Sequence, residues 1–233
     1  MAIYEGPFAS GMRGKLGNVV GAKTVGGRTA LRAYKEHVKN PNTARQQVSR
    51  AKMQQASALA AMFAEAIGIG YAKAVQGMKM YARNLFVSEV IPQGNGYFTV
   101  SGSTVTRSDK NLPLSRANGL TVVPTVALNE EQGVGYKAVV SGYSGITLNP
   151  GEKLGIIVCA YNEANGLVDV EKAVAGSSDE TEVVINPAIF SEVAPTKLCA
   201  FFKVIPAAVN GVATETIPWK YPSATGDCAY ATI

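Results

Sequence analysis

The sequence predicts an α+β protein with three successive parts. These are an N-terminal basic arm with a β-hairpin over residues 1–42, one or two helices over residues 43–90, and an antiparallel β-sandwich over residues 95–233. Two adjacent glycines separate strand-like runs near the N-terminus, an alanine-rich segment with helical spacing follows, and short strand-like runs alternate with turn residues in the remainder. With 47% hydrophobic and 17% charged residues, the chain has enough apolar side chains for a packed core.

The first part is rich in glycine, and a hairpin is expected within it. The strand-like runs Asn18–Val25 and Arg28–Lys35 are separated only by Gly26 and Gly27. Both glycines adopt positive φ without steric cost, as a type I′ turn requires. Because an isolated two-stranded hairpin is only marginally stable in water, this one is expected to pack against the rest of the chain, a neighbouring molecule or a ligand.

The second part is expected to be helical. Asn40-Pro41-Asn42 interrupts the preceding segment, and Thr43 is the expected N-cap residue. Small and apolar residues then recur at helical spacing from Ala44 to Ile67, and Gly68-Ile69-Gly70 is expected to end or kink this helix. A second helix is expected to begin at Tyr71. The alanine- and methionine-rich face of the helical segment, residues 43–87, is typical of a core or a subunit interface. We therefore expect the protein to be oligomeric.

The third part is expected to contain seven or eight short strands. Turn residues such as Asn165-Gly166 and Asn210-Gly211 separate the strand-like runs, and no long helical pattern lies between them. This spacing is typical of an antiparallel sandwich. The expected strands are Tyr97–Arg107, Leu120–Asn129, Gly135–Val140, Lys153–Tyr161, Leu167–Val174, Thr181–Ile185, Lys197–Ile205 and Val212–Trp219.

The net charge of +5 is unevenly distributed. Residues 1–52 carry ten bases and two acids, whereas residues 53–233 carry a net charge of −3. Such asymmetry indicates a polyanionic partner or an acidic neighbouring subunit, and the pattern leaves both open. The candidate contact residues are the ten bases Arg13, Lys15, Lys23, Arg28, Arg32, Lys35, Lys39, Arg45, Arg50 and Lys52.

Few residues in the chain suggest catalytic chemistry. His37 is the only histidine, and Cys159, Cys199 and Cys228 lack the C-x-x-C spacing of zinc or redox sites. No P-loop, dinucleotide-binding or nucleophile-elbow motif is complete. The sequence therefore predicts a protein that is not an enzyme and uses no cofactor or metal. Cys159 and Cys199 lie in strand-like apolar runs, so they are expected to be buried free thiols.

The sequence also predicts where the protein is made. No apolar run approaches the roughly 18 residues of a membrane span. The first residues lack a basic leader followed by an apolar block. We therefore expect a protein that is made in the cytoplasm and does not contact membranes.

Residues 14–53 carry a longer pattern. It reads G-K-x-G-x-V-V from Gly14, passes through a basic strand, and continues from Asn40 as N-P-x-T-x-x-Q-x-x-x-R-x-K-M into the alanine-rich helix. This pattern resembles an uncharacterised family found in phages, prophages and genomes of Bacteroidetes bacteria. The resemblance implies an Ig-like C-terminal region and a phage-type gene neighbourhood, and it implies no particular activity.

Two classes of function follow from these observations. The leading hypothesis is a structural protein of a bacteriophage particle, located in the virion as a shell, spike or connector component. It would assemble with further copies and with other virion proteins. Its basic arm would contact either the genome, through non-specific phosphate contacts, or a neighbouring subunit. The alternative is an Ig-like adhesin or carbohydrate-binding module, which the ten tyrosines keep open.

Overall fold

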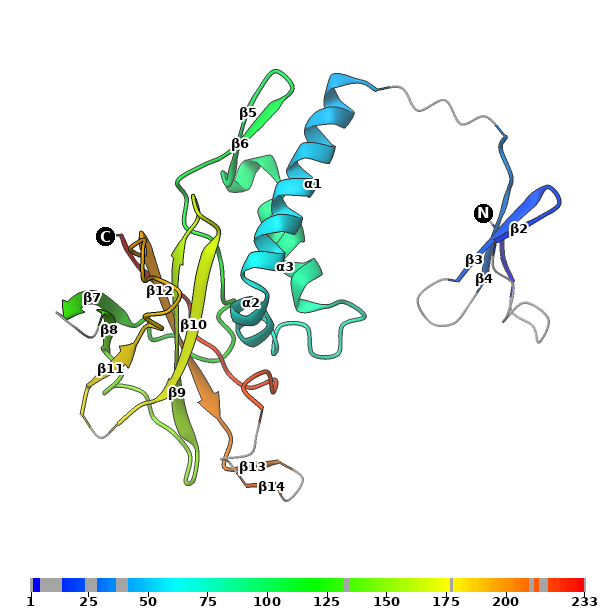
Figure 1. The fold of residues 1–233 in the computed structure, drawn as a ribbon. Helices are drawn as coiled ribbons and strands as arrows, with labels where there is room; N and C mark the ends of the chain where they lie inside the picture. Colours follow the sequence, from blue (N-terminus) through cyan, green and yellow to red (C-terminus); the bar gives the residue numbers. More distant parts are fainter. Residues whose placement is uncertain are drawn as a thin grey trace. The chain divides into compact units, whose positions relative to one another are not determined.

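A computed structural model of the chain describes residues 2–4, 14–23, 29–36, 42–131, 135–176, 178–209, 212–213 and 218–232. The chain divides into two compact units, Met1–Thr43 and Ala44–Ile233. Both contain antiparallel sheets, and the second also contains the helices, so the protein is of mixed α+β class, as predicted (Figure 1).

The first unit is a four-stranded antiparallel sheet. Its strands are β1 (Ala2–Tyr4), β2 (Gly14–Leu16), β3 (Val19–Lys23) and β4 (Thr29–Ala33), in the order β1-β4-β3-β2. The predicted hairpin is confirmed in the pairing of β3 with β4, although its expected turn at Gly26-Gly27 lies outside the described residues. The sequence analysis missed β1 and β2. These two strands flank the hairpin and relieve the marginal stability of two isolated strands.

The helical segment differs from its prediction in where it breaks. The helices are α1 (Ala44–Met62), α2 (Ala64–Gly70), α3 (Ala82–Val90) and a short 3₁₀ turn, η1 (Gln93–Asn95). A break that was not predicted falls at Phe63, whereas Gly68-Ile69-Gly70 ends α2, as predicted. At Gly70 the missing side chain serves packing, because a Cβ there would lie 2.4 Å from the carbonyl oxygen of Leu114.

The second predicted helix begins eleven residues later than expected. Residues 71–81 form turns, and α3 starts only at Ala82. Tyr71 is fully buried, and its hydroxyl donates to the carbonyl oxygen of Pro113 at 2.8 Å and contacts Glu89 Oε2 at 2.6 Å. These tertiary contacts hold residues 71–81 in turns, where helical spacing alone predicted the start of a second helix at Tyr71.

The sheets of the second unit are all antiparallel. A four-stranded sheet has the order β10-β9-β12-β15, a three-stranded sheet the order β11-β8-β7, and two hairpins pair β5 with β6 and β13 with β14. The strands are β5 (Phe98–Ser101), β6 (Thr104–Arg107), β7 (Thr125–Glu131), β8 (Gly135–Ser141), β9 (Lys153–Asn162), β10 (Leu167–Val174), β11 (Glu180–Val184), β12 (Lys197–Ile205), β13 (Ala208–Val209), β14 (Val212–Ala213) and β15 (Ala229–Thr232).

Three of the predicted strands need correction. Tyr97–Arg107 is a hairpin that turns at Gly102 with φ of +61°, and the strand expected over Leu120–Asn129 begins only at Thr125. The strand expected over Val212–Trp219 is described only at Val212–Ala213, because residues 214–217 lie outside the described part. β15 was not predicted. It pairs with β12 at the edge of the sheet, and its short run carries no pattern of its own.

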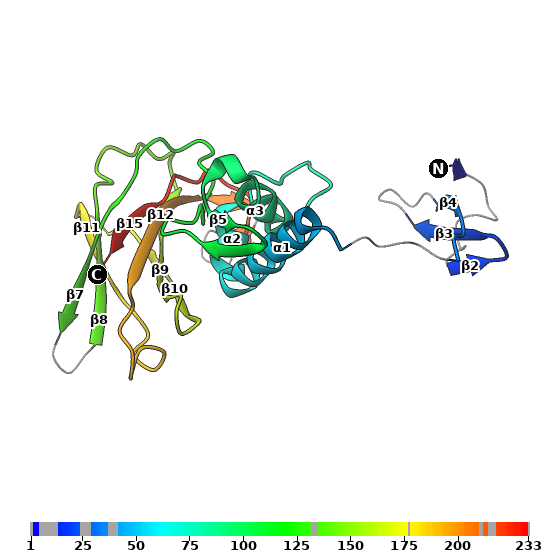
Figure 2. The ribbon, with the colours of Figure 1, turned by 90° about the horizontal axis from the view of Figure 1, so that it is seen from above.

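The second unit has three layers, seen from above in Figure 2: the sheet β11-β8-β7, the sheet β10-β9-β12-β15, and the helices. Strands β9 and β12 lie in the middle layer and are buried on both sides. Successive residues of a strand point to opposite sides, so each strand serves two cores. The side chains of Ile157, Cys159, Tyr161, Cys199 and Phe201 join the helix-side core. Those of Ile156, Val158, Ala160, Leu198, Ala200 and Phe202 join the core between the sheets.

The helices and the middle sheet therefore share one core. Phe63, at the junction of α1 and α2, is fully buried, and its ring meets that of Tyr161 edge to face with centroids 5.0 Å apart. The sequence analysis treated residues 43–90 and 95–233 as separate segments, whereas the structure joins them in one compact unit. Among the described residues, no helix has both the length and the apolar character needed to cross a membrane.

The shared core predicts that the helices and sheets unfold together. We expect Phe63→Ala to lower the free energy of unfolding by about 3–5 kcal/mol, because it leaves a cavity against Tyr161. Urea denaturation followed by circular dichroism and by tryptophan fluorescence measures this loss and should give coincident transitions. Met53→Ala, at a side chain 51% exposed on α1, is the control and should cost less than about 0.5 kcal/mol. Separate melting of the helices would contradict the shared core.

The thiols give a second test of the same core. Cys159 and Cys199 lie directly opposite each other on β9 and β12, and both are buried and free, as predicted. Burial raises the pKa of both thiols well above the usual value, which disfavours the reactive thiolate. We expect a water-soluble disulfide reagent to label at most one cysteine per native chain, the half-buried Cys228. Rapid labelling of two or more would show that the core is open.

Candidate functional site

The strand register of the first unit brings two predicted contact residues together. Lys15 of β2 lies opposite Val20 of β3, and Val20 lies opposite Arg32 of β4. Residues opposite each other in an antiparallel sheet project from the same face. Lys15 and Arg32 are both exposed, so this face presents two cations in one row across three strands.

An aromatic ring adjoins this row. Tyr34 follows Arg32 by two residues, its backbone amide donates to the carbonyl oxygen of Asn18 at 2.7 Å, and its side chain is 37% exposed. The Nζ of Lys15 lies 3.7 Å from the centroid of the Tyr34 ring, which is a cation–π contact. Lys35 is also exposed, and with Val20, Arg32 and Tyr34 it lines a shallow pocket. We call Lys15, Arg32, Tyr34 and Lys35 the basic surface.

The other seven predicted contact residues are not among the residues that define this surface. Arg45 and Arg50 are exposed on α1, which belongs to the second unit. Lys52 is a correction: its side chain is only 6% exposed and lines a pocket between α1 and the β5–β6 hairpin, so it is not part of an exposed basic face. The backbone of Lys23 is in β3, but its side chain lies outside the description. Arg13, Arg28 and Lys39 also fall outside the described residues.

The division into units also divides the charge. Residues 1–43 hold seven bases and two acids, whereas residues 44–233 hold fifteen of each, so the whole net charge of +5 belongs to the first unit. Within the second unit, residues 121–192 hold ten acids and three bases. This acidic stretch includes all three strands of the sheet β11-β8-β7.

Acidic side chains are exposed at this sheet. Glu130 and Glu131 lie at the end of β7, and Glu180 and Glu182 lie on β11, with all four exposed. Lys137 of β8 forms ion pairs with Glu131 and, at 3.5 Å, with Glu182. The hydrogen bond to Glu131 raises the pKa of Lys137. One lysine thus partners two of the four carboxylates. We call Glu131, Glu180 and Glu182 the acidic surface, because the register places them on one face of the sheet, whereas Glu130 lies opposite Tyr136 and projects from the other face.

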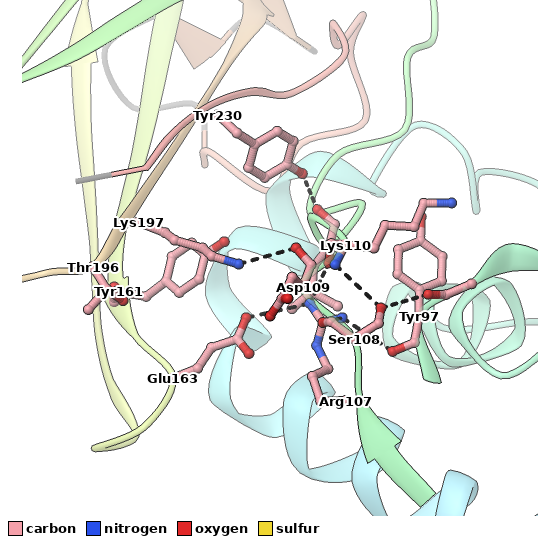
Figure 3. A network of polar contacts seen from close by, with 12 residues as sticks. Tyr97, Arg107, Ser108, Asp109, Lys110, Tyr161, Glu163, Thr196, Lys197 and Tyr230 are labelled. Carbon is pink, nitrogen blue, oxygen red and sulfur yellow. Dashed lines mark hydrogen bonds and ion pairs between the residues drawn. The ribbon is translucent and has the colours of Figure 1, made fainter. Parts of the chain in front are cut away.

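A polar network fixes the turn that follows β6 (Figure 3). Arg107 Nη1 donates to the carbonyl oxygens of Ser108 at 2.8 Å and Tyr97 at 3.3 Å, and Nη2 donates to that of Lys110 at 2.7 Å. The same Nη2 lies 3.5 Å from Glu163 in the β9–β10 turn. The guanidinium therefore joins the hairpin, the following turn and the middle sheet, which is a structural role.

The same network continues toward the C-terminus. Lys197 of β12 donates to the carbonyl oxygen of Asp109, and the hydroxyl of Tyr230 on β15 donates to that of Leu112 (Figure 3). Burial raises the pKa of Tyr230, so the hydroxyl stays protonated as a donor. In the part of the chain that the structure describes, no group of three or more His, Cys, Asp or Glu side chains is arranged to hold a metal ion.

Comparison of the chain with protein-family models, with curated proteins and with solved structures finds no match.

The Arg107 network predicts an asymmetry between its two charged members. We expect Arg107→Met to lower the free energy of unfolding by about 2–4 kcal/mol, because it leaves several backbone carbonyls without their donor. Glu163→Gln should cost less than about 1 kcal/mol, since its ion pair is long and partly exposed. Thermal or urea unfolding of both variants measures the difference. Equal losses would mean that the ion pair, and not the carbonyl contacts, holds this turn.

Proposed function

We propose that the protein is a structural component of a bacteriophage particle, in which copies of the chain assemble through electrostatic contact. The basic surface of one copy would contact the acidic surface of a neighbouring copy. The observation that carries this proposal is the segregation of charge between the two surfaces. The phage context rests on the resemblance of residues 14–53 to a phage and prophage family.

The chemistry of the two surfaces supports such a contact. Lys15, Arg32 and Lys35 are exposed cations in the first unit, which has a net charge of +5, and the acidic surface offers three exposed carboxylates. Opposite charges steer two surfaces together and fix their register more than they raise affinity. The contact should therefore weaken with salt, because exposed pairs are screened beyond about 10 Å at 0.1 M ionic strength.

The genome is the other candidate partner for the basic surface. Phosphates would also bind Lys15, Arg32 and Lys35, without sequence preference, because charge alone attracts them. A neighbouring copy is favoured here because the chain itself supplies the complementary acidic surface. The experiments below separate the two partners.

The shape of the second unit supports a more specific proposal about its fold. The resemblance implies an Ig-like C-terminal region, and two antiparallel sheets stacked over a common core are consistent with one. We propose this region as the part of the subunit that builds the particle, with the helices packed on its middle sheet.

Charge reversal tests the contact between copies. The triple variant Lys15→Glu, Arg32→Glu and Lys35→Glu should assemble at least tenfold more weakly than the wild type at low salt, because like charges then face each other. The double variant Glu180→Lys and Glu182→Lys should show the same loss. An equimolar mixture of the two variants should assemble again. Sedimentation velocity at tens of micromolar measures all three, and Lys73→Glu with Lys79→Glu, outside both sheets, is the control.

Three results would overturn parts of the proposal. A monodisperse wild-type monomer at tens of micromolar would exclude assembly through these surfaces. Unchanged assembly of the triple variant, together with lost binding to unrelated DNA duplexes, would assign the basic surface to the genome. In that case log K against log salt should slope by about −4 to −5 if about five bases meet phosphates. Absence of the protein from purified particles, by mass spectrometry, would exclude the virion role.

A further inference from the structure

A buried lysine near the end of β12 lines a cavity that shares no residue with either surface described above. The side chain of Lys203 is 1% exposed, and its Nζ is buried with no hydrogen-bond partner. Lys203 follows Phe201 by two residues, so both side chains lie on the same side of the middle sheet. The helices cover this side at Cys199 and Phe201. At Lys203 the cover of the sheet is provided by residues 218–223 and not by the helices.

The neighbouring strand leaves room for this segment. Gly155 of β9 lies directly opposite Lys203, and a Cβ at that position would lie 2.5 Å from Cζ3 of Trp219. The indole therefore lies directly on the backbone of β9. On the other side of β12, Thr225 bridges Lys203, and the carbonyl oxygen of Ala224 accepts from the amide of Val204 at 2.9 Å. The walls around Lys203 are thus built from the sheet and from the chain segment that crosses it.

The cavity has a volume of about 240 Å³ and a largely apolar wall. Its charged lining residues are Lys203 and Lys153, and no acidic side chain is found among the described residues that line it. Burial lowers the pKa of Lys203 to about 8, and no carboxylate contributes to this shift. Tyr221 is the other titratable side chain on the wall. The apolar part of the wall consists of Val174, Val204, Ile205, Pro206, Pro218 and Trp219.

An unpaired ammonium in such a place is costly. Burying a charged group away from water without a partner costs several kcal/mol, and a bound anion offsets that cost. One buried cationic donor beside an apolar wall suits a carboxylate with an apolar body. A phosphate or sulfate, with three or four oxygens, would need several donors, which on this wall are Lys203, Lys153, Tyr221 and Ser223. The largely apolar remainder of the lining favours the carboxylate.

We propose that this cavity is a binding site for a small monocarboxylate, with its carboxylate on Lys203 Nζ and its apolar body against Trp219 and the two prolines. The site is independent of the assembly surfaces, so its function can fail or hold without them. Lys203 is a binding residue here, and Gly155 is a positioning residue that admits Trp219 to the wall.

The sequence contains a single tryptophan, so Trp219 reports on this cavity directly. Titration of the full chain with hexanoate at pH 7 should change the tryptophan emission saturably and raise the melting temperature. Hexanamide, which has the same apolar body without the charge, should bind at least tenfold more weakly, because its neutral carbonyl oxygen accepts a weaker hydrogen bond and does not neutralise the ammonium. Inorganic phosphate should have no saturable effect on either readout.

Two variants assign the response to Lys203. Lys203→Met keeps the side-chain volume and removes the buried charge, so it should fold with equal or greater stability and bind hexanoate at least tenfold more weakly. Lys197→Met, on the same strand but outside the cavity, should bind as the wild type does. Raising the pH well above 8 should weaken hexanoate binding to the wild type, because Lys203 then loses its charge.

The pH dependence of the free energy of unfolding tests the unpaired state of Lys203 without a ligand. The folded pKa of Lys203 is lowered from 10.5 to about 8, so below pH 8 both states are charged and the full cost of burial is present. Between pH 8 and 10.5 the folded state is neutral while the unfolded state remains charged, so stability should rise with pH in the wild type relative to Lys203→Met. The absence of this relative rise would show that Nζ already has a partner.

Several outcomes would overturn the proposal. These are no saturable response to hexanoate at millimolar concentration, equal binding of hexanoate and hexanamide, or unchanged binding in Lys203→Met. Saturation by phosphate but not by hexanoate would show that the ligand class is wrong. Loss of hexanoate binding in Lys197→Met to the same extent as in Lys203→Met would mean that the effect is not local to the cavity.

Discussion

The burial of β9 and β12 on both sides is the constraint on which the rest of the second unit depends. A strand with one solvated face alternates apolar and polar residues, but these two strands present apolar side chains to two different cores. Each core then needs its own cover. The helices cover one side and the sheet β11-β8-β7 covers the other, so neither layer is dispensable (Figure 2). A helix segment that is too weakly amphipathic to stand alone becomes stable because this sheet gives it an apolar surface.

Two buried cations on the helix side of the middle sheet differ in their hydrogen-bond partners. Arg107 lies at the edge of the helix-side core, where backbone carbonyls of three residues and Glu163 accept hydrogen bonds from Nη1 and Nη2, although Nε has no partner. Lys203 lies on the same side of the middle sheet, but its Nζ meets no acceptor. Buried polar groups in folded proteins are nearly always satisfied, so an exception at a cavity wall points to a ligand. The contrast between these two residues is the physical basis of the binding site inferred here.

Charge is handled by a different part of the molecule. The second unit has equal numbers of bases and acids, and the first unit carries the whole excess of positive charge. A small sheet with few buried side chains tolerates several exposed cations, because their charges stay in water. Among the described residues of the second unit, the buried lysines are Lys52 and Lys203, so few charges lie in its packed core. The separation of charge also provides two surfaces of opposite sign, on which the proposed assembly depends.

The sequence by itself determined the mixed α+β class, the hairpin of β3 and β4, the strands β9, β10 and β12, and the burial of Cys159 and Cys199. These follow from local patterns: runs of apolar residues bounded by turn residues, and cysteines inside such runs. The basic surface was predicted only in part, because the sequence identified Lys15, Arg32 and Lys35 but not the register that aligns the first two of them.

Tertiary structure decided the rest. It broke the helix at Phe63, where the ring packs against that of Tyr161, a residue from a distant part of the chain. It buried Lys52, which the charge count over residues 1–52 had grouped with the other bases. It also placed Lys203 against Trp219. In the sequence Lys203 reads as an ordinary lysine near the end of a strand, and only the segment that folds back over Gly155 makes it part of a cavity. Contacts between residues far apart in the chain leave no local pattern, so no reading of the sequence alone finds them.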